Sequence, residues 1–269
     1  MIYRKLGFIG SGNITHAIIK GLIQKAQFDP GKIYVTNRSN QKAYRLAQLF
    51  GVNALNSNEA LVENSDIIFL AVKPQDFSTL IDEVRGSLSP QQAVVSLIAG
   101  ISIESLQKKL NCEHVARIVP NTAVSIGSGV IGIYSSQNYL REFLHRLFQP
   151  LGTCVTLQNE DLINSVLVAT SSGLGFMLEM MSYYCDWLAS HGFSDSEART
   201  MIQATMIGAG RLSCDNPQID LETLISQIAS KKGVTESGLK TLRSFEMDRL
   251  IRMSLDQAQQ KTEELSRLV

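Results

Sequence analysis

The chain has 269 residues, 44% of them hydrophobic, which is enough to bury the core of one large domain or of two ordinary ones, and we expect two. Its 25 acidic and 25 basic residues cancel, and neither a Lys/Arg cluster nor an alternation of aromatic and basic residues marks a nucleic-acid surface. We therefore expect no nucleic-acid partner.

The first predicted functional element is a glycine-rich turn near the N-terminus. Leu6 to Ile9 form an apolar strand, Gly10 and Gly12 permit a tight turn, and Asn13 opens an amphipathic helix whose N–H groups would face an anion. Thr15 stands where this Gly-x-Gly-x-x-Gly/Ala pattern usually has a third small residue. A turn without a ligand is the alternative, but the flanking strand and helix favour a dinucleotide site.

A second short strand, within residues 32–39, predicts which dinucleotide is bound. At the end of this strand a site for NAD(H) normally has an acidic residue, which accepts hydrogen bonds from the ribose. Here Asn37, Arg38 and Ser39 offer donors and a positive charge, which suit a 2′-phosphate. NADP(H) is therefore favoured and NAD(H) stays possible; the alternative is that Arg38 is a solvated loop residue.

Residues 67–72 predict a central strand that follows helices over residues 40–50 and 58–63, because this run is apolar without interruption. Its carboxyl end, Ala71 to Pro74, is expected beside the glycine turn, where open α/β sheets bind ligands. Val72 and Lys73 are candidate cofactor contacts, although an exposed lysine at a strand end is an equal alternative.

The next segments complete a doubly wound parallel sheet in residues 1–158. A strand over residues 93–100 is followed by a helix over 101–110 with Ser102 as its cap. A further strand begins at Val115 and ends at Pro120-Asn121-Thr122, where Asn121 is a candidate cofactor contact. A strand near Val130, a helix over 139–149 and a strand over 152–157 form the far edge. The predicted fold class is thus α/β and Rossmann-like.

Residues 159–269 predict a second, all-helical domain. Residues 162–191 are apolar on nearly every side, and a small helical domain cannot cover such a helix, so we expect a dimer interface. Glu179 and Asp186 interrupt the run, which favours a buried helix over a membrane span. Ser194 and Glu197 form a capping-box pattern at the start of the next helix.

The turn at residues 230–235 precedes a predicted long amphipathic helix. Ser230, Gly233, Thr235 and Ser237 gather hydroxyls and N–H groups at the N-terminus of this helix, where a carboxylate binds well. The alternative is ordinary capping of the helix, but capping needs only one of these residues. Finding all four together favours a site for a small acidic ligand.

Metal and disulfide sites are not indicated by the remaining residue types. The four cysteines are widely spaced without a C-x-x-C pair, and the four histidines show neither ligand spacing nor a paired nucleophile. The N-terminus lacks a signal-peptide pattern. We expect a cytoplasmic protein without metal.

The sequence resembles pyrroline-5-carboxylate reductase over essentially its whole length. The resemblance lies in the first turn and in the segments AVKP, SLIAGIS, RIVPNTAVSIGSG and SKKGVT, in this order and spacing. It implies an N-terminal dinucleotide-binding domain, a helical domain that interleaves with a partner subunit, and the NAD(P)H-dependent reduction of 1-pyrroline-5-carboxylate to L-proline, the last step of proline biosynthesis.

The resemblance also implies the site residues. The substrate carboxylate would be held by Ser230, Gly233, Val234 and Thr235. Hydride transfer to a cyclic iminium needs little acid–base catalysis, so the main task is to hold the substrate in place. Thr235 is the best candidate for that task and is therefore the catalytic candidate. The residues that would line the cofactor are Ile9, Gly10, Ser11, Gly12, Asn13, Ile14, Asn37, Arg38, Ser39, Asn58, Ala71, Val72, Lys73, Pro74 and Ala99.

Two departures from the family pattern keep alternatives open. Ser172 to Phe176 reads SGLGF where the family often has SGPAY, and Lys231, Lys232 and Val234 replace residues of the family's SPGGTT turn. The alternatives are a reductase of another cyclic imine or of a β-hydroxy acid, and a catalytically degenerate sensor that binds NADP(H).

Overall fold

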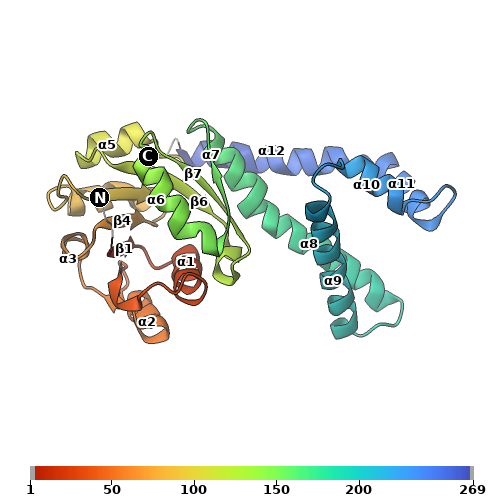
Figure 1. Cartoon of the computed structure of the whole chain (residues 1–269), viewed down its shortest axis with the longest axis horizontal. Coiled ribbons are helices and arrows are strands. Elements are labelled where there is room, and N and C mark those ends of the chain that lie inside the picture. The colour runs from red at the N-terminus through yellow and green to blue at the C-terminus, as the bar shows by residue number, and fades with distance from the viewer. Residues whose placement is uncertain (1–3, 267–269) are drawn as a thin grey trace. The chain divides into compact units, whose positions relative to one another are not determined.

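The computed structural model describes residues 4–266; the outermost ends of the two predicted domains, residues 1–3 and 267–269, lie outside the described residues (Figure 1). By its internal contacts the chain divides into two units. The first comprises Met1–Ser172 with Ala258–Val269, and the second comprises Gly173–Gln257.

The first unit contains an eight-stranded sheet in the order β3-β2-β1-β4-β5-β6-β7-β8. The strands from β3 to β6 are parallel, which confirms a Rossmann-like doubly wound sheet. Their bounds are Leu6–Ile9 (β1), Ile33–Thr36 (β2), Asn53–Ala54 (β3), Ile67–Leu70 (β4), Ala93–Ser96 (β5), Val115–Pro120 (β6), Gly129–Tyr134 (β7) and Gly152–Thr156 (β8).

The strand direction reverses at the far edge of the sheet. β7 runs antiparallel to β6, and β8 is parallel to β7, so both run against the other strands. The cause is the β6–β7 connection, a short loop with the 3-10 turn Thr122–Ile126. A parallel crossover needs a dozen or more residues, usually with a helix.

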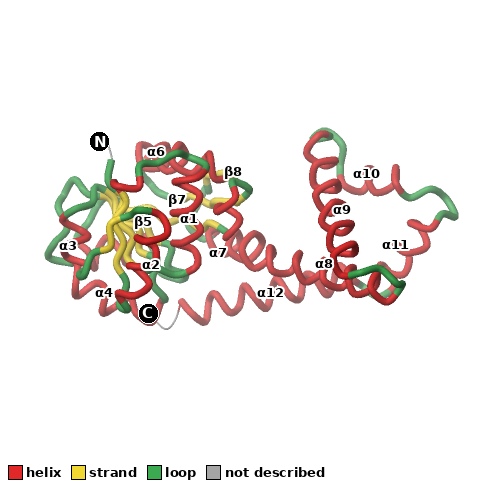
Figure 2. Tube along the Cα trace, turned by 90° about the horizontal axis from the view of Figure 1, so that it is seen from below, coloured by secondary structure: helices red, strands yellow, loops and turns green. Residues whose placement is uncertain are grey.

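Helices cover both faces of the sheet, and Figure 2 shows them in red around the yellow strands. Residues on β4 alternate between the faces: Ile67 and Phe69 belong to one buried cluster, and Ile68 and Leu70 belong to the other. The first cluster packs under α1 (Asn13–Gln24), α2 (Asn40–Phe50) and α6 (Asn138–Phe148), and the second under α3 (Asn58–Glu63), α4 (Phe77–Val84) and α5 (Ile103–Leu110).

The border of the first unit lies beyond the predicted division at residue 158 because the next segment packs on the sheet. α7 (Leu162–Val166) is followed by a π-helical segment, Leu167–Ser172, and the buried Ile163 clusters with Val119 of β6. Just before α7, Glu160 accepts hydrogen bonds of 2.8 Å from both the buried Arg117 Nη1 and the backbone N–H of Ile103.

The second unit is helical, and its elements are α8 (Gly173–Ser190), α9 (Asp195–Asp215), α10 (Leu221–Ile228), α11 (Val234–Ser244) and most of α12 (Met247–Ser266). The predicted capping box is present, since Ser194 and Glu197 exchange side-chain and backbone hydrogen bonds. The single long helix predicted after residue 235 is wrong: it breaks between α11 and α12, where Glu246 has a φ of 52°.

Large apolar side chains of the second unit are mostly exposed within this chain. Trp187 is 61% exposed and Phe245 is 76% exposed. The helical run Leu162–Ser190 is long and apolar enough to cross a membrane by length and composition, and only 17% of its most apolar window is buried within the chain. The contacts within one described chain therefore do not supply the burial expected for this run.

Candidate functional site

The glycine turn is held where the carboxyl ends of β1 and β4 converge. Gly10 has a φ of 105°, and a Cβ atom there would lie 2.4 Å from the carbonyl oxygen of Ala71, which is impossible without backbone movement. The Thr15 hydroxyl donates to the carbonyl of Gly10 at 2.6 Å and is fully buried. This bond gives Thr15, the unusual residue of the pattern, a structural role.

Gly12 differs from Gly10, because a Cβ at Gly12 would meet no atom within 4 Å. Gly12 is the N-cap of α1, has ordinary extended backbone, and makes no side-chain cap, so the N–H groups of the first turn face this open space. No acidic residue lies in that turn. An anion therefore fits here, as the diphosphate of a dinucleotide requires.

The turn opens into a cavity of about 620 Å³ within the first unit. This volume is in the range of small-molecule and cofactor sites. The sequence-predicted residues that line it are Ile9, Gly10, Ser11, Gly12, Asn37, Arg38, Ser39, Asn58, Ala71, Val72 and Lys73.

Five other predicted cofactor residues are not in the lining. Asn13 and Ile14 lie within α1, directly after the lining residues, Pro74 begins a 3-10 turn, and Ala99 is half-buried after β5. Asn121 is buried, and its amide bonds are used internally: Nδ2 donates to the carbonyl of Thr170, and Oδ1 accepts from the N–H of Val130. In this structure Asn121 ties the π-helical segment to the sheet.

Backbone and side-chain bonds fix the turn against the end of β2. The N–H of Ser11 donates to Asn37 Oδ1 at 3.1 Å, and the Ser11 hydroxyl donates to the carbonyl of Thr36 at 3.1 Å. Asn37 Nδ2 also donates to the carbonyl of Ser39. The diphosphate-binding turn and the predicted ribose-binding loop are therefore one connected surface.

Arg38 lies at the mouth of the cavity and pairs with Asp76. The Nη1–Oδ1 distance is 3.2 Å, and the arginine side chain is 90% exposed. Exposed ion pairs of this kind contribute about 0–1 kcal/mol, so a phosphate can compete for the guanidinium. Lys42, on the first turn of α2, lines the same cavity and adds a second cation.

A short relay crosses the cavity wall from β2 to α4. The Thr36 hydroxyl donates to Asn58 Oδ1 at 2.6 Å, and Asn58 Nδ2 donates to Glu83 Oε2 at 2.5 Å. An ionised carboxylate only accepts hydrogen bonds, so the amide N–H₂ of Asn58 must face Glu83. The relay therefore sets which way both side chains point.

Sequence reasoning missed the lining residues that come from α4 and its approach. A signal was present: positions 76, 79, 80 and 83 recur at helical spacing and share the face next to the strand end. The missed residues of this group are Gln75, Asp76, Thr79, Leu80 and Glu83, and Lys42 of α2 was missed as well.

The predicted carboxylate turn lies in the second unit, between α10 and α11. Gly233 N–H donates to the carbonyl of Ser230 at 2.9 Å, and a Cβ on Gly233 would lie 2.4 Å from Ser230 Oγ and 2.9 Å from the Ser230 carbonyl oxygen, so the turn packs closely around this glycine. Gly233 is the N-cap of α11 without a side-chain cap bond. Thr235 and Val234, in the first turn of α11, are exposed.

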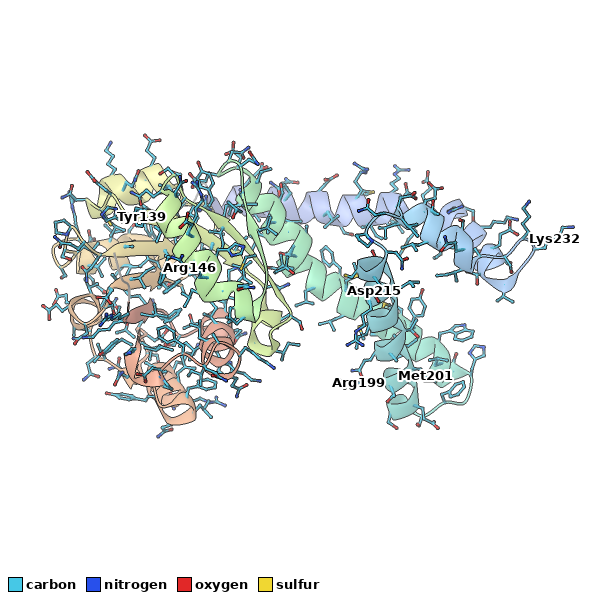
Figure 3. All side chains as sticks on the ribbon, in the orientation of Figure 1. Tyr139, Arg146, Arg199, Met201, Asp215 and Lys232 are labelled. Carbon is cyan, nitrogen blue, oxygen red and sulfur yellow. The ribbon has the colours of Figure 1, made fainter. Side chains whose placement is uncertain are left out.

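The side chains of Lys231 and Lys232 form no ion pair with Glu236 among the described residues. Lys232 has a φ of 58°, and Figure 3 shows its side chain projecting from the tip of the turn. Glu236 accepts from the backbone N–H of Lys232 at 2.7 Å and pairs with Lys240 at 3.5 Å. The charge of Glu236 is thus engaged by neighbours, and the N-cap of α11 makes no side-chain bond to the first N–H groups of the helix.

Other kinds of chemistry find little support among the described residues. No group of three or more His, Cys, Asp or Glu side chains could hold a metal ion. All four cysteines are free, and burial raises the pKa of Cys154 to about 11 and that of Cys112 in the same direction. Neither of these thiols is ionised at neutral pH, so neither is an activated nucleophile.

Comparison with protein-family models identifies both halves of the chain. Residues 5–100 match the family model described as NADP oxidoreductase coenzyme F420-dependent. Residues 160–265 match the model described as pyrroline-5-carboxylate reductase dimerisation. The first match contains the glycine turn and the cavity, and the second contains the turn between α10 and α11.

Several proteins that match along the whole chain are named as pyrroline-5-carboxylate reductases. Pyrroline-5-carboxylate reductases of Staphylococcus aureus (strain COL) and Staphylococcus saprophyticus are each 30% identical to this chain, and the alignments cover 97–98% of this chain and 98% of theirs. A solved pyrroline-5-carboxylate reductase of Coxiella burnetii has 26% identity and a TM-score of 0.84 over 98% of both chains. A Plasmodium falciparum pyrroline carboxylate reductase, solved with NADP bound, has 20% identity and a TM-score of 0.87 over 97% of this chain and 98% of that one.

Gly12→Val tests whether the open space at the turn is a ligand site. We expect a nearly unchanged melting temperature, because the backbone at Gly12 is extended and its Cβ direction is empty. NADPH binding, measured by titration calorimetry, should weaken by at least about tenfold because the side chain fills the space for the diphosphate. Gly10→Ala is the contrasting variant, and it should lower the melting temperature. Unchanged NADPH binding by Gly12→Val would contradict the assignment.

Proposed function

This chain belongs to the pyrroline-5-carboxylate reductase family, and we propose that it reduces 1-pyrroline-5-carboxylate to L-proline with a reduced pyridine nucleotide. The observation that carries the proposal is the cavity at the glycine turn, where Gly12 leaves room for a diphosphate in front of free N–H groups of α1. Similarity to reductases of this name over 98% of the chain supports the same activity.

The chemistry that we propose needs little acid–base machinery. When bound, the reduced nicotinamide supplies a hydride to the imine carbon. The protein's contribution is to hold the substrate by its carboxylate and to exclude misaligned poses. No His or Cys on the cavity wall is required, which agrees with the residues that line it.

We assign the substrate carboxylate to the turn between α10 and α11. Its supports are the uncapped N-terminus of α11, the exposed Thr235 and the close packing of Gly233 against Ser230. The partial positive charge of a helix N-terminus stabilises an anion, and the hydroxyl of Thr235 in the first turn adds a donor. Ser230, Gly233, Val234 and Thr235 remain the proposed substrate residues.

NADPH is the cofactor that we propose as preferred. Arg38 and Lys42 put two cations at the end of β2, where the 2′-phosphate of NADPH would lie, and no acidic residue occupies positions 37–39. Asp76 neutralises part of this charge, so the preference rests on phosphate replacing Asp76 as the partner of Arg38. NADH remains a possible substrate.

A dimer through the helical domain is the assembly that we propose. The exposed apolar side chains of α8 need a cover that one chain does not supply, and the matching family model is a dimerisation domain. A second copy would bury them without exposing Glu179 or Asp186 to lipid. We place the enzyme in the cytoplasm, where its four free cysteines stay reduced.

The activity itself is tested by mixing the purified chain with NADPH and 1-pyrroline-5-carboxylate. Loss of nicotinamide absorbance with stoichiometric L-proline is expected. NADPH binding without oxidation would favour the alternative of a catalytically degenerate sensor, which the altered SGLGF segment suggests. Oxidation only in the presence of another cyclic imine would assign a different substrate.

Thr235→Ala should raise the Michaelis constant for the imino acid by about tenfold, because it removes one hydrogen bond to a charged group. The Michaelis constant for NADPH should change little. Thr235→Ser, which keeps the hydroxyl, is the matched control and should stay close to the wild type. Comparable losses for both ligands would contradict the assigned place of Thr235.

Arg38→Ala should weaken NADPH by about tenfold and leave NADH nearly unchanged, because a charge-assisted bond to the 2′-phosphate is lost. The ratio of kcat/KM for the two cofactors measures this. Arg45→Ala, which removes an exposed arginine of α2 outside the cavity lining, is the control. An unchanged cofactor ratio for Arg38→Ala would show that this residue does not recognise the phosphate.

A further inference from the structure

Glu83 is a carboxylate in the wall of the dinucleotide cavity to which hydride transfer gives no role. It lies near the end of α4, and Thr79 and Leu80, about one turn earlier on the same helix, line the cavity with it. A negative charge in a site for a phosphate-rich ligand is unfavourable unless it meets a hydrogen-bond donor. The question is therefore which part of the ligand carries that donor.

The position of Glu83 is tied to the adenosine end of the cavity. Thr36, the last residue of β2, is linked to Glu83 through Asn58 by hydrogen bonds of 2.6 and 2.5 Å. The residues proposed to bind the adenosine ribose, Asn37 to Ser39, follow Thr36 directly. The diphosphate turn at Gly10 to Gly12 belongs to β1 and the start of α1 instead.

One oxygen of the Glu83 carboxylate has a hydrogen-bond partner that fixes its orientation. Oε2 accepts from Asn58, and Glu83 makes no ion pair with any residue in the part of the chain that the structure describes. The second oxygen, Oε1, is an acceptor that can bind only a donor. Asp76, the other carboxylate of the wall, is already paired with Arg38.

The adenosine end of NADPH offers few donors to such an acceptor. Its 2′ position is a phosphate, which Glu83 would repel, and the ribose lies beside the residues that follow β2. The adenine ring has one exocyclic donor, the 6-amino group, and apolar faces that suit Leu80 and Val72, both of which line the cavity. We propose that Glu83 selects adenine by accepting a hydrogen bond from its 6-amino group.

The proposal rests on the proposed dinucleotide function and is tested with a cofactor whose 6-amino group is replaced by oxygen. This probe is reduced nicotinamide hypoxanthine dinucleotide phosphate, which presents an acceptor where NADPH presents a donor. The wild-type chain should bind NADPH about fivefold more tightly than the probe, because an exposed carboxylate gains one bond with adenine and repels the hypoxanthine oxygen. Calorimetric titration of the full-length protein measures both affinities.

Glu83→Gln should cancel or reverse this preference. Asn58 still presents its N–H₂ group, so it selects the carbonyl edge of the new glutamine and turns the glutamine N–H₂ toward the base. A donor at that place matches the oxygen of hypoxanthine and not the amine of adenine. Affinity for the probe should therefore rise about fivefold while affinity for NADPH falls by a similar factor.

Asp82→Asn is the matched control, because it neutralises the adjacent, exposed carboxylate of α4 that does not line the cavity. It should leave both affinities at their wild-type values. Equal affinities of the wild type for the two dinucleotides, or equal changes for both in Glu83→Gln, would show that Glu83 does not recognise position 6 of the base and would overturn the proposal. Failure of the wild type to bind either dinucleotide would instead refute the dinucleotide function.

Discussion

The structure depends on the close approach of two backbone segments at Gly10. The ends of β1 and β4 come so near to each other that a single Cβ atom would collide with the carbonyl of Ala71. This contact aligns the strand ends, and the loops after them then form one cavity edge. Thr15 adds to the constraint, since its buried hydroxyl satisfies the carbonyl of Gly10 from inside the fold. The ligand is left with the N–H groups of α1, which suits an anion.

The two units differ in how far they bury their own apolar side chains. The first has its own core on both faces of the sheet, with Phe8 and Phe69 stacked at a centroid distance of 4.6 Å. In the second, helices keep their hydrogen bonds and caps, but side chains such as Trp187 and Phe245 are exposed within the chain. Helices with exposed apolar faces gain stability only from another surface, so the second unit depends on assembly in a way that the first does not.

Much of the first unit could be predicted from the sequence because its signals are local. The bounds of β1, α2 and α3 coincide with the predicted ranges, and the glycine turn follows from one strand, two glycines and one helix start. The reversal of β7 was missed because strand direction depends on the path of the connection and not on strand composition. The break at Glu246 was missed because a residue other than glycine at positive φ has no strong sequence signal.

The candidate site was predicted where its residues follow strand ends and missed where a helix face supplies them. Asn58 lines the cavity, and its amide groups also connect Thr36 with Glu83. Such a role depends on three segments meeting in space, and no spacing in the chain reveals it. Asn121 gives the same lesson, because both sides of its amide bind backbone groups instead of facing the cavity.

The ion pair between Arg117 and Glu160 links positions that lie on different elements of the first unit. Arg117 is only 6% exposed on an inner strand, and Glu160 is its one carboxylate partner among the described residues. Removing either partner of such a pair costs about 3–5 kcal/mol, whereas exchanging both for apolar residues is often tolerated. In related proteins the two positions should therefore vary together, with charged pairs and uncharged pairs both present and mixed pairs rare.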